Sequence, residues 1–361
     1  MMAYNSVLKH LSESPRVWLI TGVAGFIGCN LLEQLLNLNQ YVVGLDNFST
    51  GYQHNLDEVL SGVGAGRAAR FHFVKGDIRD FETCRTCTKD VDVVLHQAAL
   101  GSVPRSIDDP VAANQSNIDG FLNMLAAARE NRVGRFVYAS SSSVYGDDER
   151  LPKVEENIGR PLSPYALTKY VNELYADVFG RVYGIECIGL RYFNVFGQRQ
   201  DPGGPYAAVV PKWFTGLLRG EQIYIFGDGE TSRDFCYIDN AVQANLLAAC
   251  TGNRAAVGRV FNVACGERTT LNRLFELIRD EVAGVNPAAA NATPVYQDFR
   301  PGDIRHSLAD ISKAADLLGY RPAFSLRDGI RKAAGWYVKK AGILPEIRKE
   351  VRSPAKEAAG E

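Results

Sequence analysis

The sequence predicts an α/β fold with a doubly wound parallel sheet, that is, a sheet covered by helices on both faces. Short apolar runs, such as VWLIT (17–21) and YVVGLD (41–46), alternate with longer segments whose apolar residues recur at helical spacing. Strands that are apolar throughout are buried on both faces, which is typical of parallel sheets. The Gly- and Pro-rich stretch at 197–213 interrupts this alternation and predicts a smaller α/β lobe.

The expected elements follow in a regular order. A short amphipathic helix should precede the first strand, and FIGCNLLEQLLNLN (26–39) is the first helix of the alternation. Further strands are predicted at 70–77, 90–99, 135–143 and 185–197, and further helices at 117–133 and 164–184. We expect a main domain of residues 1–191 plus about 238–265, a lobe of about 192–237 plus 266–345, and a charged tail at 346–361.

The composition narrows the class of partner. The 361 residues are 46% hydrophobic and 22% charged, with 40 basic and 41 acidic side chains and a formal net charge of −1. That balance predicts neither a nucleic-acid nor an anionic-membrane partner. No apolar run is long enough to span a bilayer, and the N-terminal residues lack the apolar core of a secretion signal. We therefore expect a cytoplasmic protein.

Cysteines and histidines give no sign of a metal site. The seven cysteines are expected to be reduced thiols, and Cys84 and Cys87 form a single C-x-x-C without a second pair. The five histidines are scattered without the spacing of metal ligands. No metal is assigned.

A dinucleotide site is predicted where the first strand ends. Gly22, Gly25 and Gly28 follow the strand and open the first helix, with a G-x-x-G-x-x-G spacing that departs by one residue from the usual fingerprint. Glycines there let a pyrophosphate approach backbone N–H groups. Asp46 ends the second strand, where a carboxylate accepts ribose hydroxyls and repels a 2′-phosphate, so the cofactor is predicted to be NAD rather than NADP.

SPYALTKY (163–170) predicts a reactive phenol. Ser163 and Pro164 suit a helix start, and Tyr165 and Lys169 lie four apart on one face of that helix. A fixed cation close to a phenol favours the phenolate, so the pKa of Tyr165 is expected to be lowered.

These motifs, in this order, resemble the extended short-chain dehydrogenase/reductase family. The glycine triplet, YASSSSVYG (138–146) and Tyr165-x-x-x-Lys169 carry the resemblance, which covers roughly residues 15 to 342. Within the family the chain is most similar to nucleotide-sugar epimerases, and among them to bacterial UDP-N-acetylglucosamine 4-epimerases. The resemblance implies a Rossmann-type domain with bound NAD, and a homodimer formed through the helices around 112–131 and 164–183.

The resemblance also implies roles for individual residues. Tyr165 would be the catalytic acid/base, Lys169 would bind the nicotinamide ribose, and Ser141 would be the third catalytic residue. The implied cofactor contacts are Gly22, Gly25, Phe26, Ile27, Gly28, Asp46, Asn47, Ser49, Gly51, Asp77, Ile78, Gln97, Ala98, Ala99, Ser140, Tyr165, Lys169 and Tyr192. Gly76 would also lie near the adenine.

A UDP-N-acetylhexosamine is the implied substrate. Its contacts would be Ser102, Ser141, Ser142, Tyr165, Asn194, Gln200, Val209, Lys212, Tyr224, Arg233, Arg300, Asp303 and Ser307. Within this set Arg233 and Arg300 would clamp the diphosphate, because a guanidinium pairs with phosphate oxygens through a planar fork. Asp303 would contact the uridine ribose.

The expected reaction is reversible epimerisation at C4 of UDP-N-acetylglucosamine to UDP-N-acetylgalactosamine, with some activity on UDP-glucose and UDP-galactose. Ser141 is followed by Ser142 and Ser143 rather than by carboxylates, which argues against a dehydratase. Ser307 replaces the bulky tyrosine of epimerases restricted to UDP-glucose and UDP-galactose, which favours an acetamido sugar. Three alternatives stay open: a UDP-glucuronate 4-epimerase, whose relatives share the serine run, a one-way oxidoreductase, and a UDP-sugar- or NAD-binding protein without turnover.

Overall fold

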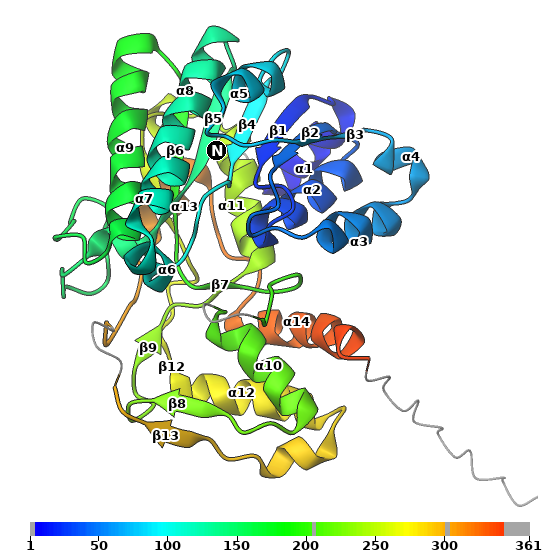
Figure 1. The fold of residues 1–361 in the computed structure, drawn as a ribbon, viewed down its shortest axis with the longest axis vertical. Helices are drawn as coiled ribbons and strands as arrows, with labels where there is room; N and C mark the ends of the chain where they lie inside the picture. The colour runs from blue at the N-terminus through cyan, green and yellow to red at the C-terminus, as the bar shows by residue number, and fades with distance from the viewer. Residues whose placement is uncertain (1–3, 204–206, 300–303, 343–361) are drawn as a thin grey trace, which may run out of the picture.

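A central sheet of seven parallel strands forms the core of the protein, in the order β3-β2-β1-β4-β5-β6-β11 (Figure 1). The structure is a computed structural model, and it describes residues 4–203, 207–299 and 304–342. The sheet strands are β1 (Val17–Thr21), β2 (Tyr41–Asp46), β3 (Phe71–Lys75), β4 (Val93–His96), β5 (Arg135–Ser141), β6 (Cys187–Tyr192) and β11 (Val260–Val263). The strand order reverses beside β1, as in Rossmann-type folds, so the predicted fold class is confirmed.

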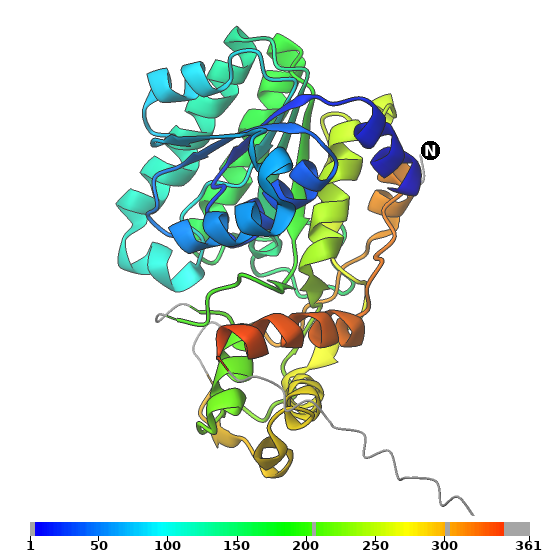
Figure 2. The same ribbon diagram turned by 90° about the vertical axis from the view of Figure 1, so that its right-hand side faces the viewer.

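Helices cover both faces of the sheet (Figures 1 and 2). Within β1, Trp18 and Ile20 pack into one apolar core and Leu19 into the other, so alternate side chains of a fully buried strand serve the two faces. One layer contains α2 (Phe26–Asn37), α3 (Gln53–Val63) and α11 (Ile238–Cys250), and the other α5 (Phe81–Cys87), α8 (Gly120–Glu130) and α9 (Pro164–Tyr183). The predicted N-terminal helix is α1 (Tyr4–Glu13), which packs on α11.

A smaller lobe lies beyond the carboxyl ends of the strands (Figure 1). Its helices are α10 (Val209–Arg219), α12 (Leu271–Ala283) and α14 (Leu326–Lys340). Its strands form two-stranded sheets: β7 (Val195–Phe196) with β10 (Cys236–Tyr237), β9 (Ser232–Arg233) with β12 (Thr269–Thr270), and β8 (Tyr224–Phe226) with β13 (Val295–Gln297). We propose that this lobe and the sheet domain divide as the sequence suggests, with one difference: α13 (Ser312–Leu318) packs on β11 and covers that edge of the main sheet.

The long helix α9 begins and ends where the sequence places it. The Ser163 hydroxyl caps its first turn by accepting from the Ala166 N–H at 3.1 Å, and Gly184 ends it with a φ of +74°. The helix expected at 117–133 is instead a π-helical segment, Gln115–Asp119, followed by α8. The remaining short helices α4 (Ala65–Ala68), α6 (Val103–Asp108) and α7 (Pro110–Asn114) are not evident from sequence periodicity.

None of the helices in the described ranges combines the length and the apolar character that a membrane crossing requires.

Candidate active site

The loop between β1 and α2 and the start of α2 are packed so closely that Gly22 and Gly28 leave no room for a side chain. Gly22 has a φ of +70°, and a Cβ there would lie 2.8 Å from the Ala98 nitrogen. A Cβ on Gly28 would lie 2.1 Å from the Gly22 carbonyl oxygen, so the helix and the loop touch backbone to backbone. Gly25 stands at the start of α2, and no side chain caps that helix end. The first turn of α2 therefore presents N–H groups that no side chain caps, which is how helix N-termini bind a pyrophosphate.

A cavity of about 80 Å³ opens beside this loop. Its lining includes ten of the residues expected to contact the cofactor: Gly22, Gly25, Asp46, Asn47, Ser49, Asp77, Ile78, Gln97, Ala98 and Ala99. It also includes Gly76, and Leu45, Thr50, Leu100 and Ser116, which the sequence reasoning did not single out. Phe26, Ile27, Gly28 and Gly51 lie in or against the loop without lining the cavity.

The acidic residues of this cavity are held by hydrogen bonds, Asp46 from backbone N–H groups and Asp77 mainly from side chains. Asp46 accepts from the N–H groups of Ala24 and Phe48 at 2.9 and 2.8 Å, and burial raises the pKa of its carboxyl, opposed by those hydrogen bonds. Asn47 donates to Asp77 at 2.8 Å, and the hydrogen bonds from Arg79 lower the pKa of Asp77 to about 2. A glycine cradle, an uncapped helix and a buried carboxylate at the end of β2 fit the pyrophosphate and adenosine ribose of NAD.

Tyr165 stands in the first turn of α9, beside the carboxyl end of β5. Its backbone N–H donates to the Ser106 hydroxyl of α6 at 2.9 Å, and its hydroxyl is hydrogen-bonded to Ser141. Lys169, one turn later, is buried, and its Nζ donates to the Ala139 carbonyl oxygen of β5 at 2.9 Å. The structure thus brings Ser141, Tyr165 and Lys169 together.

The expectation that Lys169 lowers the pKa of Tyr165 is wrong for this structure. Burial raises the pKa of Tyr165, and the hydrogen bond with Ser141 only partly opposes that shift. The Lys169 Nζ lies 6.0 Å from the phenol ring centroid, and burial lowers the pKa of Lys169 itself to about 8. Desolvation disfavours the charged form of both groups.

Two other residues expected at the cofactor are engaged in side-chain networks. The Tyr192 hydroxyl donates to Gln97 at 3.2 Å and accepts from Asn245 at 2.8 Å, which places it next to the residues that line the cofactor cavity. The Ser140 hydroxyl instead donates to Glu173 at 2.5 Å, inside the sheet–helix interface. The Ser140 side chain is therefore held in this interface, and its contact with the cofactor stays a prediction.

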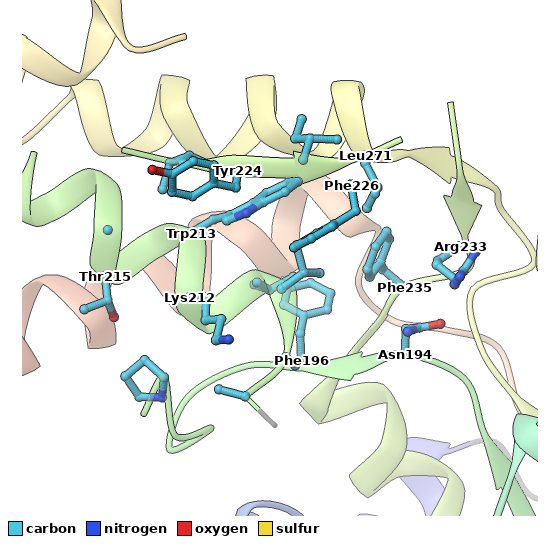
Figure 3. A pocket seen from close by; sticks show the side chains of 18 of the residues that line it. Asn194, Phe196, Lys212, Trp213, Thr215, Tyr224, Phe226, Arg233, Phe235 and Leu271 are labelled. Carbon is cyan, nitrogen blue, oxygen red and sulfur yellow. The ribbon is translucent and has the colours of Figure 1, made fainter. Parts of the chain in front are cut away.

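A second cavity, of about 710 Å³, lies in the smaller lobe (Figure 3). Five of the expected substrate contacts line it: Asn194, Val209, Lys212, Tyr224 and Arg233. Aromatic walls that the sequence did not reveal are supplied by Phe196, Trp213, Phe226 and Phe235 (Figure 3). The strand alternation of IYIFG was the one available signal, since it places Tyr224 and Phe226 on the same face of β8. An apolar cavity with a few polar and cationic groups suits a nucleotide.

The remaining expected substrate contacts lie outside this cavity. Ser102 caps α6, and Ser142 follows β5, so both stand on elements that adjoin Tyr165. The Gln200 amide donates to the Val195 carbonyl at 3.2 Å, and the Ser307 N–H donates to the Ser232 carbonyl at 3.0 Å, next to Arg233. Arg300 and Asp303 lie outside the described residues.

The chain is similar to known proteins over most of its length. Residues 18–264 match the model of the NAD dependent epimerase/dehydratase family. A putative UDP-glucose 4-epimerase of Methanocaldococcus jannaschii is 37% identical over 88% of this chain and 97% of its own length.

Two solved structures are similar to this chain in both fold and sequence. The UDP-N-acetylglucosamine 4-epimerase from Methanobrevibacter ruminantium, in complex with UDP-N-acetylmuramic acid, is 38% identical with a TM-score of 0.82, over 91% of this chain and 99% of that one. The UDP-glucuronic acid 4-epimerase from Bacillus cereus, with UDP-glucuronic acid and NAD, is 31% identical with a TM-score of 0.79, over 90% and 99%. With its glycine cradle and its tyrosine–lysine helix, this chain belongs to the NAD dependent epimerase/dehydratase family.

Proposed function

We propose that the protein interconverts UDP-N-acetylglucosamine and UDP-N-acetylgalactosamine by reversible epimerisation at C4, using tightly bound NAD. It is a UDP-sugar 4-epimerase, in agreement with the activities named for its relatives. The observation that carries the proposal is the cluster of Ser141, Tyr165 and Lys169 at the edge of the sheet that the smaller lobe faces. Ser141 is in register with Tyr192, and Asn194, two residues later, lines the large cavity.

Proton transfer is the task proposed for Tyr165. Because burial favours the neutral phenol, its Oη carries a proton at neutral pH until a positive charge lies beside it. When bound, oxidised NAD supplies that charge together with a reversible hydride acceptor. Once the phenol has released its own proton to solvent, Tyr165 Oη can take the proton of the sugar 4-hydroxyl, with Ser141 hydrogen-bonded to it, and return that proton to the keto oxygen on the reverse step.

The reaction requires the sugar end of the substrate to move and the nucleotide end to stay fixed. The 4-keto sugar must rotate before it is reduced on its other face, while the uridine diphosphate stays in place. The large cavity supports this division, because its aromatic walls and the cations Lys212 and Arg233 suit a nucleoside diphosphate. The sugar would then lie between this cavity and Tyr165.

Small side chains support the proposal that the sugar site accepts an acetamido group. Ser142 and Ser307 are both partly exposed and leave more space than a tyrosine would. UDP-glucuronate is the second candidate, because Ser141, Ser142 and Ser143 offer hydroxyl donors to a carboxylate.

A parallel proton-NMR time course with UDP-N-acetylglucosamine, UDP-glucose and UDP-glucuronate, without added oxidant, tests the proposal. Conversion of UDP-N-acetylglucosamine at the highest kcat/KM would support it. A preference for UDP-glucuronate would replace it with the second candidate. Net accumulation of reduced cofactor would indicate a one-way oxidoreductase, and unchanged sugars a binding protein.

We also propose a homodimer. An apolar stripe on α9 is exposed to solvent, with Leu167, Leu174, Val178 and Val182 between 40% and 62% accessible. On α6 and α7, which pack against α9, Ile107 and Val111 are 60% and 64% accessible. Contiguous exposed apolar side chains of this kind are typical of an interface.

A further inference from the structure

Arg199 has an unusual conformation for a buried arginine. Its φ is +64°, in the left-handed region, and its side chain is only 5% exposed. A non-glycine residue is strained in this region, so the surroundings must hold it there. It lies in residues 197–201, which we call the strap, between β7 and α10.

The guanidinium of Arg199 reaches two helices of the sheet domain. Its Nη1 and Nη2 donate to the two carboxylate oxygens of Glu33 on α2, at 2.8 and 2.9 Å. Its Nε donates to Glu58 on α3, at 3.1 Å. The Arg199 guanidinium therefore lies between the carboxylates of Glu33 and Glu58, and its bidentate pair with Glu33 fixes the direction of the Arg199 side chain.

The rest of the strap is held on the same surface. Asn30 of α2 donates to the Gln198 carbonyl at 3.2 Å and accepts from the Gln198 amide at 3.0 Å. The Tyr52 hydroxyl, at the start of α3, donates to Asp201 at 2.7 Å. From the smaller lobe, the Tyr337 hydroxyl of α14 donates to the Gly197 carbonyl at 3.1 Å. The strap is thus bonded to both lobes.

The position of the strap connects the two halves of the active site. Upstream of it lies Asn194, and downstream α10 begins at Val209, and both residues line the large cavity. On the other side, α2 begins directly after Gly25 of the cofactor loop. Arg199 therefore ties the wall of the substrate cavity to the helix that carries the cofactor loop, although it touches neither cavity.

We propose that Arg199 is a positioning residue that keeps the smaller lobe closed on the sheet domain while the 4-keto sugar rotates between the two hydride transfers. The inference requires 4-epimerase chemistry but not a particular sugar. In that chemistry the sugar alcohol loses a hydride to the cofactor and a proton to the protein, and the resulting ketone is held only by non-covalent contacts. If the lobes separate before the hydride returns, the ketone leaves and the cofactor stays reduced by two electrons. Loss of Arg199 removes the ion pairs that attach the strap to Glu33 of α2 and Glu58 of α3, so the smaller lobe is held less firmly on the sheet domain.

The test compares Arg199→Met with the wild-type holoenzyme on whichever UDP-sugar the wild type epimerises. Free 4-keto sugar is measured by mass spectrometry, reduced cofactor by its absorbance, and strap mobility by hydrogen–deuterium exchange of residues 197–203. We expect the keto sugar released per epimerisation to rise at least about tenfold, with faster exchange in the strap. Arg199→Lys should give an intermediate ratio, because lysine restores the charge without the fork.

Leu36→Ala, in the apolar core on α2, is the control for a general loss of stability. It should lower the melting temperature without changing the ratio of keto sugar to epimer. Should Arg199→Met not fold, Tyr52→Phe removes the hydrogen bond to Asp201 alone and should still raise the ratio severalfold. The proposal fails if the Arg199 and Tyr52 variants lose stability or turnover while that ratio and the strap exchange stay at the wild-type values.

Discussion

The Ser140 hydroxyl of β5 donates a hydrogen bond of 2.5 Å to the Glu173 carboxylate of α9, inside the interface between sheet and helix. Arg191 of β6 pairs with the same carboxylate at 2.7 Å, and both charged side chains are at least 94% buried. Glu173 lies two helical turns after Tyr165, so this contact fixes the rotation of the helix that carries the tyrosine and the lysine.

Removing Glu173 should be costly for stability. Glu173→Ala leaves the Arg191 guanidinium buried without its partner, so we expect a loss of about 3–5 kcal/mol in the free energy of unfolding. Urea denaturation measures it. Asp177→Ala, on the next turn, breaks the exposed pair with Arg181 and should change stability by less than about 1 kcal/mol. Equal effects of the two substitutions would contradict the assignment.

Tyr165→Phe should separate chemistry from binding. The variant keeps the ring and loses only the Oη that moves the proton, so we expect turnover to fall by about 10²–10⁴-fold with normal NAD content. Tyr170→Phe, on the same helix, is the matched control and should retain wild-type turnover. Near-normal rates in Tyr165→Phe would remove Tyr165 from its proposed role.

Features that depend on residues close together in the sequence could be predicted, whereas features that depend on contacts between distant residues could not. Strands such as β1 and β2 and the glycine loop are predictable, because apolar runs and glycine positions are local signals. The pKa direction of Tyr165 is not, because it depends on burial beneath α6 and beside β5, which sequence spacing cannot measure.

Hydrogen bonds between residues far apart in the sequence could not be predicted either, because no local pattern indicates them. Asn117 donates to the Leu100 carbonyl and to Thr168, and so joins the end of β4 to α9, but the three residues share no sequence pattern. Arg199 lies in the Gly- and Pro-rich stretch that predicts the smaller lobe, and its partners Glu33 and Glu58 are more than 140 residues away in the chain.

Gly28→Ala tests the cofactor loop. The added Cβ would lie 2.1 Å from the Gly22 carbonyl oxygen, so loop and helix must move apart, and we expect NAD affinity to fall by at least about tenfold. Fluorescence titration of the apo-protein with NAD measures it. Gly62→Ala in α3 is the control, because its nearest neighbour would be 3.9 Å away, and it should bind NAD normally with unchanged or slightly higher stability.

His96 should make stability depend on pH. It is buried and hydrogen-bonded to the Thr21 hydroxyl at 2.9 Å, and burial, assisted by the charge of Lys169, lowers its pKa to about 3. Between this value and the ordinary pKa near ~6.5 the unfolded chain binds more protons than the folded one, so stability falls as the pH falls through that window. Urea denaturation from pH 7 to pH 4 should show a flatter dependence for His96→Phe than for the wild type, and parallel curves would contradict it.

The apolar stripe on α9 predicts a specific change of oligomeric state. Leu174 is 49% and Val178 40% exposed one turn apart, so a charge at either position would have to be buried in the proposed dimer. We expect Val178→Asp to convert a dimer into a monomer in light scattering coupled to size-exclusion chromatography. Val295→Asp is the control, because Val295 is 43% exposed on β13 of the smaller lobe and should leave the mass unchanged. Because α9 also carries Tyr165 and Lys169, we further expect the monomer to show reduced turnover, and a monomeric wild type would remove this interface altogether.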